Sequence, residues 1–119
     1  MVKVKERIID IDEILNTLQP KQKETVQNLR ALIKSAVPET AEFVKNKNIT
    51  YKLNNKDFVW IRHFQNHVDL DFSMGSRLDS DLLKSRGKKK PEDVRHTRVS
   101  NFDKLKPRIV RLLKATALI

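Results

Sequence analysis

The chain has 119 residues, a length typical of one folded domain, and 39% of them are hydrophobic, which is enough for an apolar core. It contains no cysteine, which excludes disulfide bonds, thiolate metal sites and a cysteine nucleophile in this sequence. The formal net charge is +10, and the stretch from Lys84 to Lys114 carries most of it, with twelve basic residues against three acidic ones. We expect a single domain over residues 1–119 with a concentrated basic C-terminal third.

Two amphipathic helices are predicted at the start of the chain. Apolar residues recur with helical spacing over residues 9–18, and a second apolar stripe runs over residues 20–36. Pro20 suits the first turn of the second helix, and Pro38 stands just beyond its end. The segment 39–48 ends in a polar run, and we interpret it as a loop or a short helix.

The periodicity then changes to that of strands. Residues 49–53 alternate apolar and polar side chains, residues 58–61 form a continuous apolar run, and residues 68–72 alternate again. Asn54-Asn55 supplies a tight turn between the first two segments. These segments predict an antiparallel meander in which the run at 58–61 is a central strand covered on both faces, with Trp60 in the core. Stacking of Trp60 and Tyr51 on a nucleic-acid base is the alternative.

The remaining chain predicts a short helix, a further strand and a closing helix. Leucines with helical spacing run from Leu78 towards Gly87, and the exposed loop GKKKPED follows. Residues 94–99 form a candidate strand, and Ser100 with Asp103 matches a capping pattern for the last helix. The expected fold is α+β, with an antiparallel sheet of about four to five strands packed against two N-terminal helices and a C-terminal helix.

The basic C-terminal third predicts a surface for an anionic partner. Such a cluster attracts the phosphate groups of nucleic acid or of a small phosphate-bearing ligand. A lysine-rich surface that serves only solubility is the alternative explanation of the same pattern. The candidate anion-binding residues are Lys88, Lys89, Lys90, Arg95, His96 and Arg98.

A candidate metal site lies on the predicted strand at 68–72. His67, Asp69 and Asp71 point to one face of this strand, and imidazole and carboxylate groups are metal ligands. Neighbouring side chains on one face are about 7 Å apart, so the three would converge on one ion only by bending inward. A solvated strand face is the alternative.

No reaction is assigned from the sequence. It contains neither a recognisable catalytic constellation nor a phosphate-binding glycine loop, and it has only two glycines. The N-terminal MVKVKERIID lacks an uninterrupted apolar segment, and no stretch approaches the roughly 18 apolar residues of a membrane span. We expect a cytoplasmic protein that does not act at a membrane and that binds rather than catalyses, with an unknown cofactor.

Three segments carry a family resemblance: IDEILNTLQPKQKETVQNLRALIKSAVPE, FVWIRHFQNHVDLDFSMGSRL and LLKSRGKKKPEDVRHTRVSNFDKLK. Their order, with Pro-Glu after the helical pair and Gly-Lys followed by Arg-His-x-x-Val, resembles the YdhG-like domains, which are largely of unknown function. The resemblance implies a curved antiparallel sheet packed against helices. Because some members are described as frataxin-like intracellular iron chaperones, it also implies an iron or small-molecule carrier as the alternative to an anion-binding domain.

Overall fold

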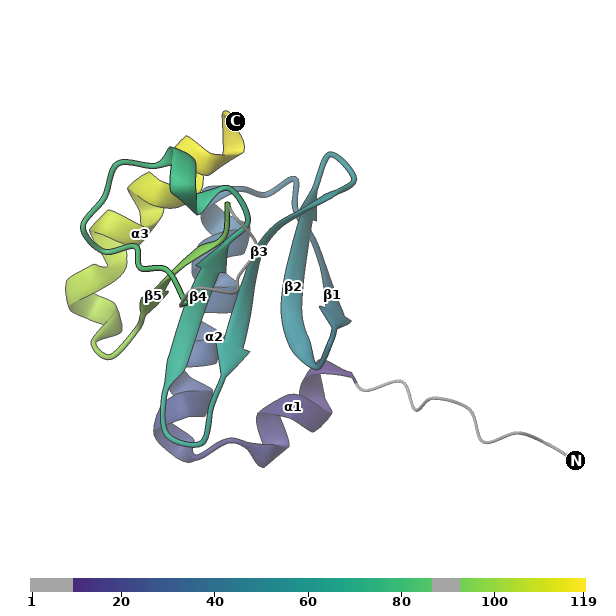
Figure 1. Ribbon diagram of the computed structural model, residues 1–119. Coiled ribbons are helices and arrows are strands. Elements are labelled where there is room, and N and C mark those ends of the chain that lie inside the picture. Colours follow the sequence, from purple (N-terminus) through teal and green to yellow (C-terminus); the bar gives the residue numbers. More distant parts are fainter. Residues whose placement is uncertain (1–9, 87–92) are drawn as a thin grey trace, which may run out of the picture.

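The computed structural model of the chain describes residues 10–86 and 93–119 (Figure 1). Within these ranges the chain forms three α-helices, one 3-10 turn and a five-stranded antiparallel sheet, so the predicted α+β fold is confirmed. No helix among the described residues has both the length and the apolar character needed to cross a membrane. The elements in chain order are α1 (Ile11–Thr17), α2 (Pro20–Ala36), β1 (Ala41–Lys45), β2 (Asn48–Leu53), β3 (Lys56–His63), β4 (Val68–Phe72), η1 (Gly75–Arg77), β5 (Arg95–Arg98) and α3 (Phe102–Ala117).

The order of the strands in the sheet is the order of the strands in the chain, from β1 to β5. Two-residue turns join β1 to β2 and β2 to β3, and all four turn residues have positive φ, between 52° and 65°. Such turns match the twist of paired strands, and asparagine tolerates this conformation well. The turn at Asn54-Asn55 was predicted; the one at Asn46-Lys47 was not.

The interpretation of segment 39–48 as a loop or short helix is therefore wrong. Residues 41–45 form β1, which pairs with β2 over its whole length. The mild helical preference of this segment is overridden because the turn at Asn46-Lys47 brings its backbone groups opposite unpaired partners on β2.

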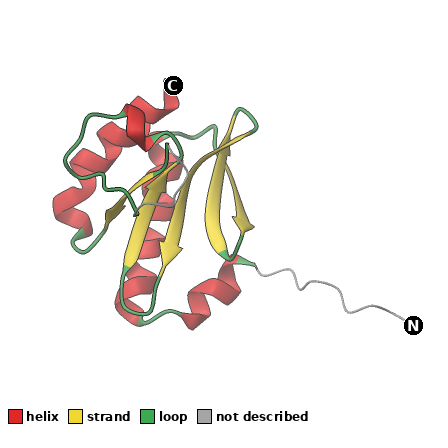
Figure 2. Ribbon diagram, viewed as in Figure 1, coloured by secondary structure: helices red, strands yellow, loops and turns green. Residues whose placement is uncertain are grey.

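The apolar core lies between one face of the sheet and the helices α2 and α3. Figures 1 and 2 show α2 passing behind β3 and β4, with α3 beside it. Leu29 and Ile33 of α2 and Ile109 and Leu113 of α3 are fully buried. Each such side chain contributes roughly 1.5–3 kcal/mol through its removal from water. The predicted alternation of β4 is confirmed, because its apolar residues all point into this core.

The predicted position of Trp60 in the core is wrong. Val59 and Ile61 are buried, and Trp60 alternates with them, so it pairs with Thr50 and Asp71 on the opposite face of the sheet. β3 holds one extra residue opposite Tyr51/Lys52, where its register with β2 shifts. This irregularity interrupts the alternation of side chains along β3, so the sequence reads as a continuous apolar run.

Two expectations for the second half of the chain also need correction. Residues 78–86 form no α-helix; the leucines of this segment pack against the core from an irregular backbone, and Lys84 pairs with His96 of β5. Pairing with a strand satisfies backbone groups that a helix would otherwise satisfy. The cap of α3 is Asn101, whose side chain accepts a hydrogen bond from the Lys104 backbone, rather than Ser100.

A buried polar cluster links α2 to the outer strands. The guanidinium of Arg30 donates to both carboxylate oxygens of Glu42 at 2.9 and 3.0 Å, and the hydroxyl of the fully buried Tyr51 donates to the same carboxylate. Burial alone would raise the pKa of Glu42, but the hydrogen bonds from Arg30 and Tyr51 outweigh it and lower that pKa. The cluster therefore holds Glu42 ionised.

Glu42→Gln should reduce the free energy of unfolding by about 1–3 kcal/mol at neutral pH, because a charge-assisted contact with Arg30 is lost. The stabilising effect of a carboxylate with a lowered folded pKa is present above its ordinary pKa of 4.5 and is lost as the pH falls below that value. Urea denaturation of the wild type and the variant should thus converge between about pH 5 and about pH 3. A constant difference across this range would contradict the assignment.

Candidate functional site on the polar face of the sheet

The sheet face opposite α2 and α3 carries polar and charged side chains, and we call it the polar face. Strand registers define its members, because residues that pair directly across antiparallel strands share a face. Its residues are Phe43 and Lys45 of β1, Asn48, Thr50 and Lys52 of β2, Asp57, Trp60 and Arg62 of β3, Asp69 and Asp71 of β4, and His96 and Arg98 of β5.

Two buried aspartates lie at the centre of this face, held by one arginine. Asp69 and Asp71 are each only 1% exposed. Arg86 donates to Asp69 Oδ2 at 2.8 Å, to Asp71 Oδ1 at 2.7 Å and to Asp71 Oδ2 at 3.2 Å. Burial would lower the pKa of Arg86, but the two carboxylates raise it. Since buried carboxylates without a partner are very costly, Arg86 is the group that makes this arrangement stable.

The position of Arg86 depends on how the preceding segment is attached to β5. The backbones of Lys84 and His96 exchange two hydrogen bonds of 2.8 and 2.9 Å. Earlier in the same segment, η1 packs so closely on β5 that a Cβ at Gly75 would lie 2.5 Å from Arg95 Cβ. Only glycine permits this approach. The segment is thereby fixed along β5, and Arg86 extends from it over the polar face.

Two histidines and a second arginine surround Asp69. His67 Nε2 lies 3.7 Å and Arg98 Nε lies 3.9 Å from Asp69 Oδ1, while His96 Nε2 lies 3.8 Å from Asp69 Oδ2. Burial, followed by the charge of Arg86, lowers the pKa of His96, so its imidazole is neutral at pH 7. Asp69 Oδ1 and His96 Nδ1 are buried and have no hydrogen-bond partner among the described residues.

Beside this cluster the polar face is hollowed over β1, β2 and β3. A hollow of about 260 Å³ is lined by Trp60 and Arg62 together with residues of the first turn and β2. Lys45 and Asp57 form an ion pair of 2.6 Å at its rim. The guanidinium carbon of Arg62 lies 5.7 Å from the ring centroid of Phe64, and Arg62 makes no ion pair with any of residues 10–86 or 93–119.

The structure describes three of the six predicted anion-binding residues. His96 and Arg98 share the polar face. Arg95 pairs with the core residue Phe72 and therefore lies on the other face of β5. Lys88, Lys89 and Lys90 lie outside the described residues.

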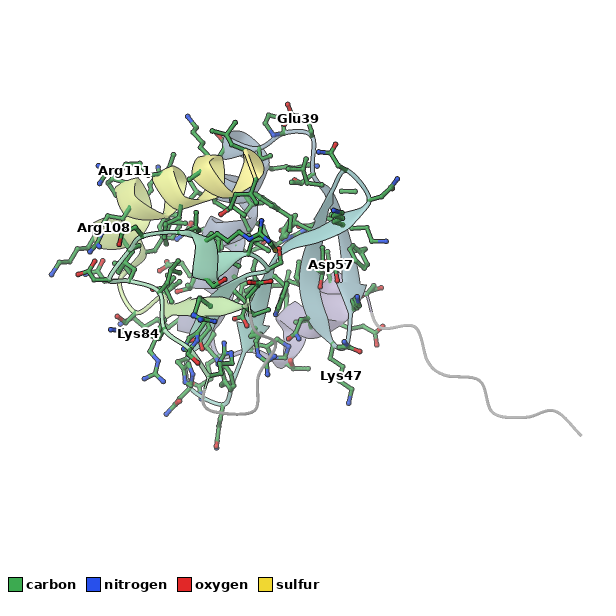
Figure 3. All side chains as sticks on the ribbon, turned by 45° about the horizontal axis from the view of Figure 1, so that its top comes forward. Glu39, Lys47, Asp57, Lys84, Arg108 and Arg111 are labelled. Atoms are coloured by element: carbon green, nitrogen blue, oxygen red, sulfur yellow. The ribbon has the colours of Figure 1, made fainter. Side chains whose placement is uncertain are left out.

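Five further basic residues of the C-terminal third belong to α3. Figure 3 shows Arg108 and Arg111 projecting outward from this helix, away from the sheet. Arg108 is paired with Asp81, whereas Lys104 and Lys106 are exposed. Among the described residues, the basic third thus contributes both to the polar face and to the outer surface of α3 (Figure 3).

The predicted metal residues are brought together, but in a different setting from the one expected. His67 and Asp69 are neighbours, and Asp69 and Asp71 are buried, so the alternative of a solvated strand face is wrong for the aspartates. Both carboxylates accept hydrogen bonds from Arg86. Among the residues that the structure describes, no group of three or more His, Asp or Glu side chains is arranged to hold a metal ion.

Sequence reasoning missed Arg62, Trp60 and Arg86 as members of this face. The first two had a signal, since Trp60 and Arg62 are two apart in β3 and alternate with Val59 and Ile61. Arg86 had none, because its contacts depend on the path of an irregular segment.

Comparison with protein families adds one finding. A family model described as "Domain of unknown function (DUF5655)" matches residues 11–116. The chain belongs to the DUF5655 family. No curated protein and no solved structure matches it.

The DUF5655 match runs from the start of α1 into the last turn of α3, so it includes every residue of the polar face. This family description assigns neither a ligand nor a reaction. The resemblance to YdhG-like domains stays a prediction beside it.

Arg86→Met should destabilise the DUF5655 domain by about 3–5 kcal/mol, because it leaves two buried carboxylates without their compensating charge. The triple variant Asp69→Asn, Asp71→Asn, Arg86→Met should recover most of this loss. Arg111→Met, on the exposed surface of α3, is the matched control and should change stability by less than about 0.5 kcal/mol. If Arg86→Met unfolds at the same denaturant concentration as that control, the proposed role of Arg86 is wrong.

Proposed function

We propose that this domain binds a phosphate-bearing partner on the polar face of the sheet. The observation that carries the proposal is a row of side chains across the strands, in which Arg62 and Arg98 lie on either side of Asp69. Lys45 of β1 is the register partner of Asn48 of β2, and it lies on the same face, further towards the β1 edge than Arg62. Arginines in such a row offer planar, multidentate donors to phosphate oxygens.

The aspartates of this face neutralise its exposed arginines only in part, since Asp69 lies 3.9 Å from Arg98 but is held more closely by Arg86 at 2.8 Å. Asp69 and Asp71 are buried and take their hydrogen bonds from Arg86, whereas the side chain of Arg98 is 63% exposed. With Arg86 included, the face holds five cationic side chains against three carboxylates. A positive field therefore extends from the face into water, where it attracts anions.

The frataxin-like iron carrier implied by the YdhG-like resemblance has weaker support. Iron sites of that type need clustered oxygen ligands that are free to coordinate. At Asp69 and Asp71 the guanidinium of Arg86 holds three of the four carboxylate oxygens. We therefore favour the anion-binding function.

The test uses fluorescently labelled inorganic polyphosphate, which carries phosphate without a base or a sugar. Arg62→Ala with Arg98→Ala should weaken binding and reduce the slope of log K against log salt concentration by about two, because two phosphate contacts are lost. Fluorescence anisotropy at several salt concentrations measures both quantities.

The matched control removes two charges from the other basic surface, in Lys104→Ala with Lys106→Ala on α3. This variant should keep nearly the full salt slope. A larger loss from the α3 variant than from the arginine variant would assign binding to α3 and refute the proposal, as would an absence of binding at low ionic strength.

A further inference from the structure

We infer that the phosphate-bearing partner is single-stranded nucleic acid, with one unpaired base stacked on Trp60. This inference rests on the proposed function and adds an identity to the partner. It starts from the unexpected position of Trp60, which lines the hollow on the polar face instead of packing in the core.

Trp60 is the largest of three aromatic side chains that lie outside the apolar core, the others being Phe43 and Phe64. The sequence has one tryptophan and one tyrosine, and Tyr51 is fully buried. Trp60 is only partly buried, and the hollow that it lines is edged by Asn48 and Thr50. An indole presents a flat π-surface on which any base can stack, and the side-chain amide of Asn48 offers hydrogen bonds to base edges.

Cationic side chains lie in the row next to that of Trp60 and extend across the sheet from β1 to β5, as a strand that crosses the sheet requires. Neighbouring strands are about 4.8 Å apart, so Lys45 on β1 and Arg98 on β5 each lie two strands, or roughly 10 Å, from β3. Arg62 is two residues from Trp60 on the same strand and the same face. A base on Trp60 would thus have phosphates of its own strand beside arginine and lysine in both directions.

The shape of the face favours a single strand over a duplex. Five strands span roughly 19 Å, which is wider than the major groove of about 12 Å that admits a helix or a two-stranded ribbon. The base pairs of a duplex are also stacked on one another, and an indole reaches a base face only where a base is unpaired.

Because Trp60 is the only tryptophan, fluorescence excited at a wavelength that the single tyrosine does not absorb reports on this position alone. Titration with a ten-residue oligothymidylate should quench this fluorescence as the base stacks. An abasic oligonucleotide of the same length should bind about tenfold more weakly and leave the fluorescence unchanged. This comparison uses the unaltered protein, so it does not depend on how a variant folds.

Two variants extend the test. Trp60→Ala should weaken oligothymidylate binding about tenfold and leave abasic and polyphosphate binding unchanged, whereas Trp60→Phe should retain most of the affinity. Far-ultraviolet circular dichroism and a melting curve check that each variant is folded.

The outcomes separate this inference from the proposed function. Equal binding of oligothymidylate and the abasic strand without quenching overturns the stacking role of Trp60 and leaves phosphate binding in place. Tighter binding of a duplex or of an acidic peptide than of the single strand also overturns it. Failure of both polyphosphate and oligonucleotides to bind overturns the two together.

Discussion

The architecture around the candidate site depends on one electrostatic constraint, the compensation of two buried carboxylates by Arg86. Asp69 and Asp71 occupy the centre of β4, where water cannot solvate them. A sheet with this pair uncompensated would be strongly destabilised, so the segment after β4 has to return a cation to the same place. That requirement is met because residues 73–86 run alongside β5 in space, where Lys84 pairs with His96. The polar face therefore has its two aspartates buried beneath the surface, with Arg62 and Arg98 on either side of them.

The same constraint determines what the basic C-terminal third can do. Arg86 is a structural cation, because its donors are used by the aspartates. Arg98 is held less closely, at 3.9 Å from Asp69 and 3.4 Å from His67, and its side chain is 63% exposed, so it remains accessible to a ligand. Trp60 and Arg62 extend the face towards β1, beyond the residues that the charge pattern indicated. Part of the basic charge of the C-terminal third lies on α3, away from the polar face (Figure 3).

How much the sequence reveals differs between the fold and the site. Period-two alternation at 68–72 and the Asn54-Asn55 turn predicted strands correctly, because both signals are local and have direct geometric causes. The β1 strand was missed because its pairing with β2 outweighs local preference, and the helix after Leu78 was wrong because three leucines fit an irregular packed segment equally well. Asp69 and Asp71 were identified as candidates, but their burial could not be predicted. It is stable only because Arg86 compensates their charge, and Arg86 contacts them only in the folded chain.

The strand order has a kinetic consequence for the site. From β1 to β4 each strand pairs with its chain neighbour through a short connection, and such local contacts form rapidly during folding. Only the junction of β4 with β5 closes a long loop, residues 73–94, and loop closure of that length is slower. Nascent chains therefore acquire the four-stranded meander first and complete the carboxylate–arginine cluster last. Ligand binding would then report completion of the native state rather than the presence of the sheet.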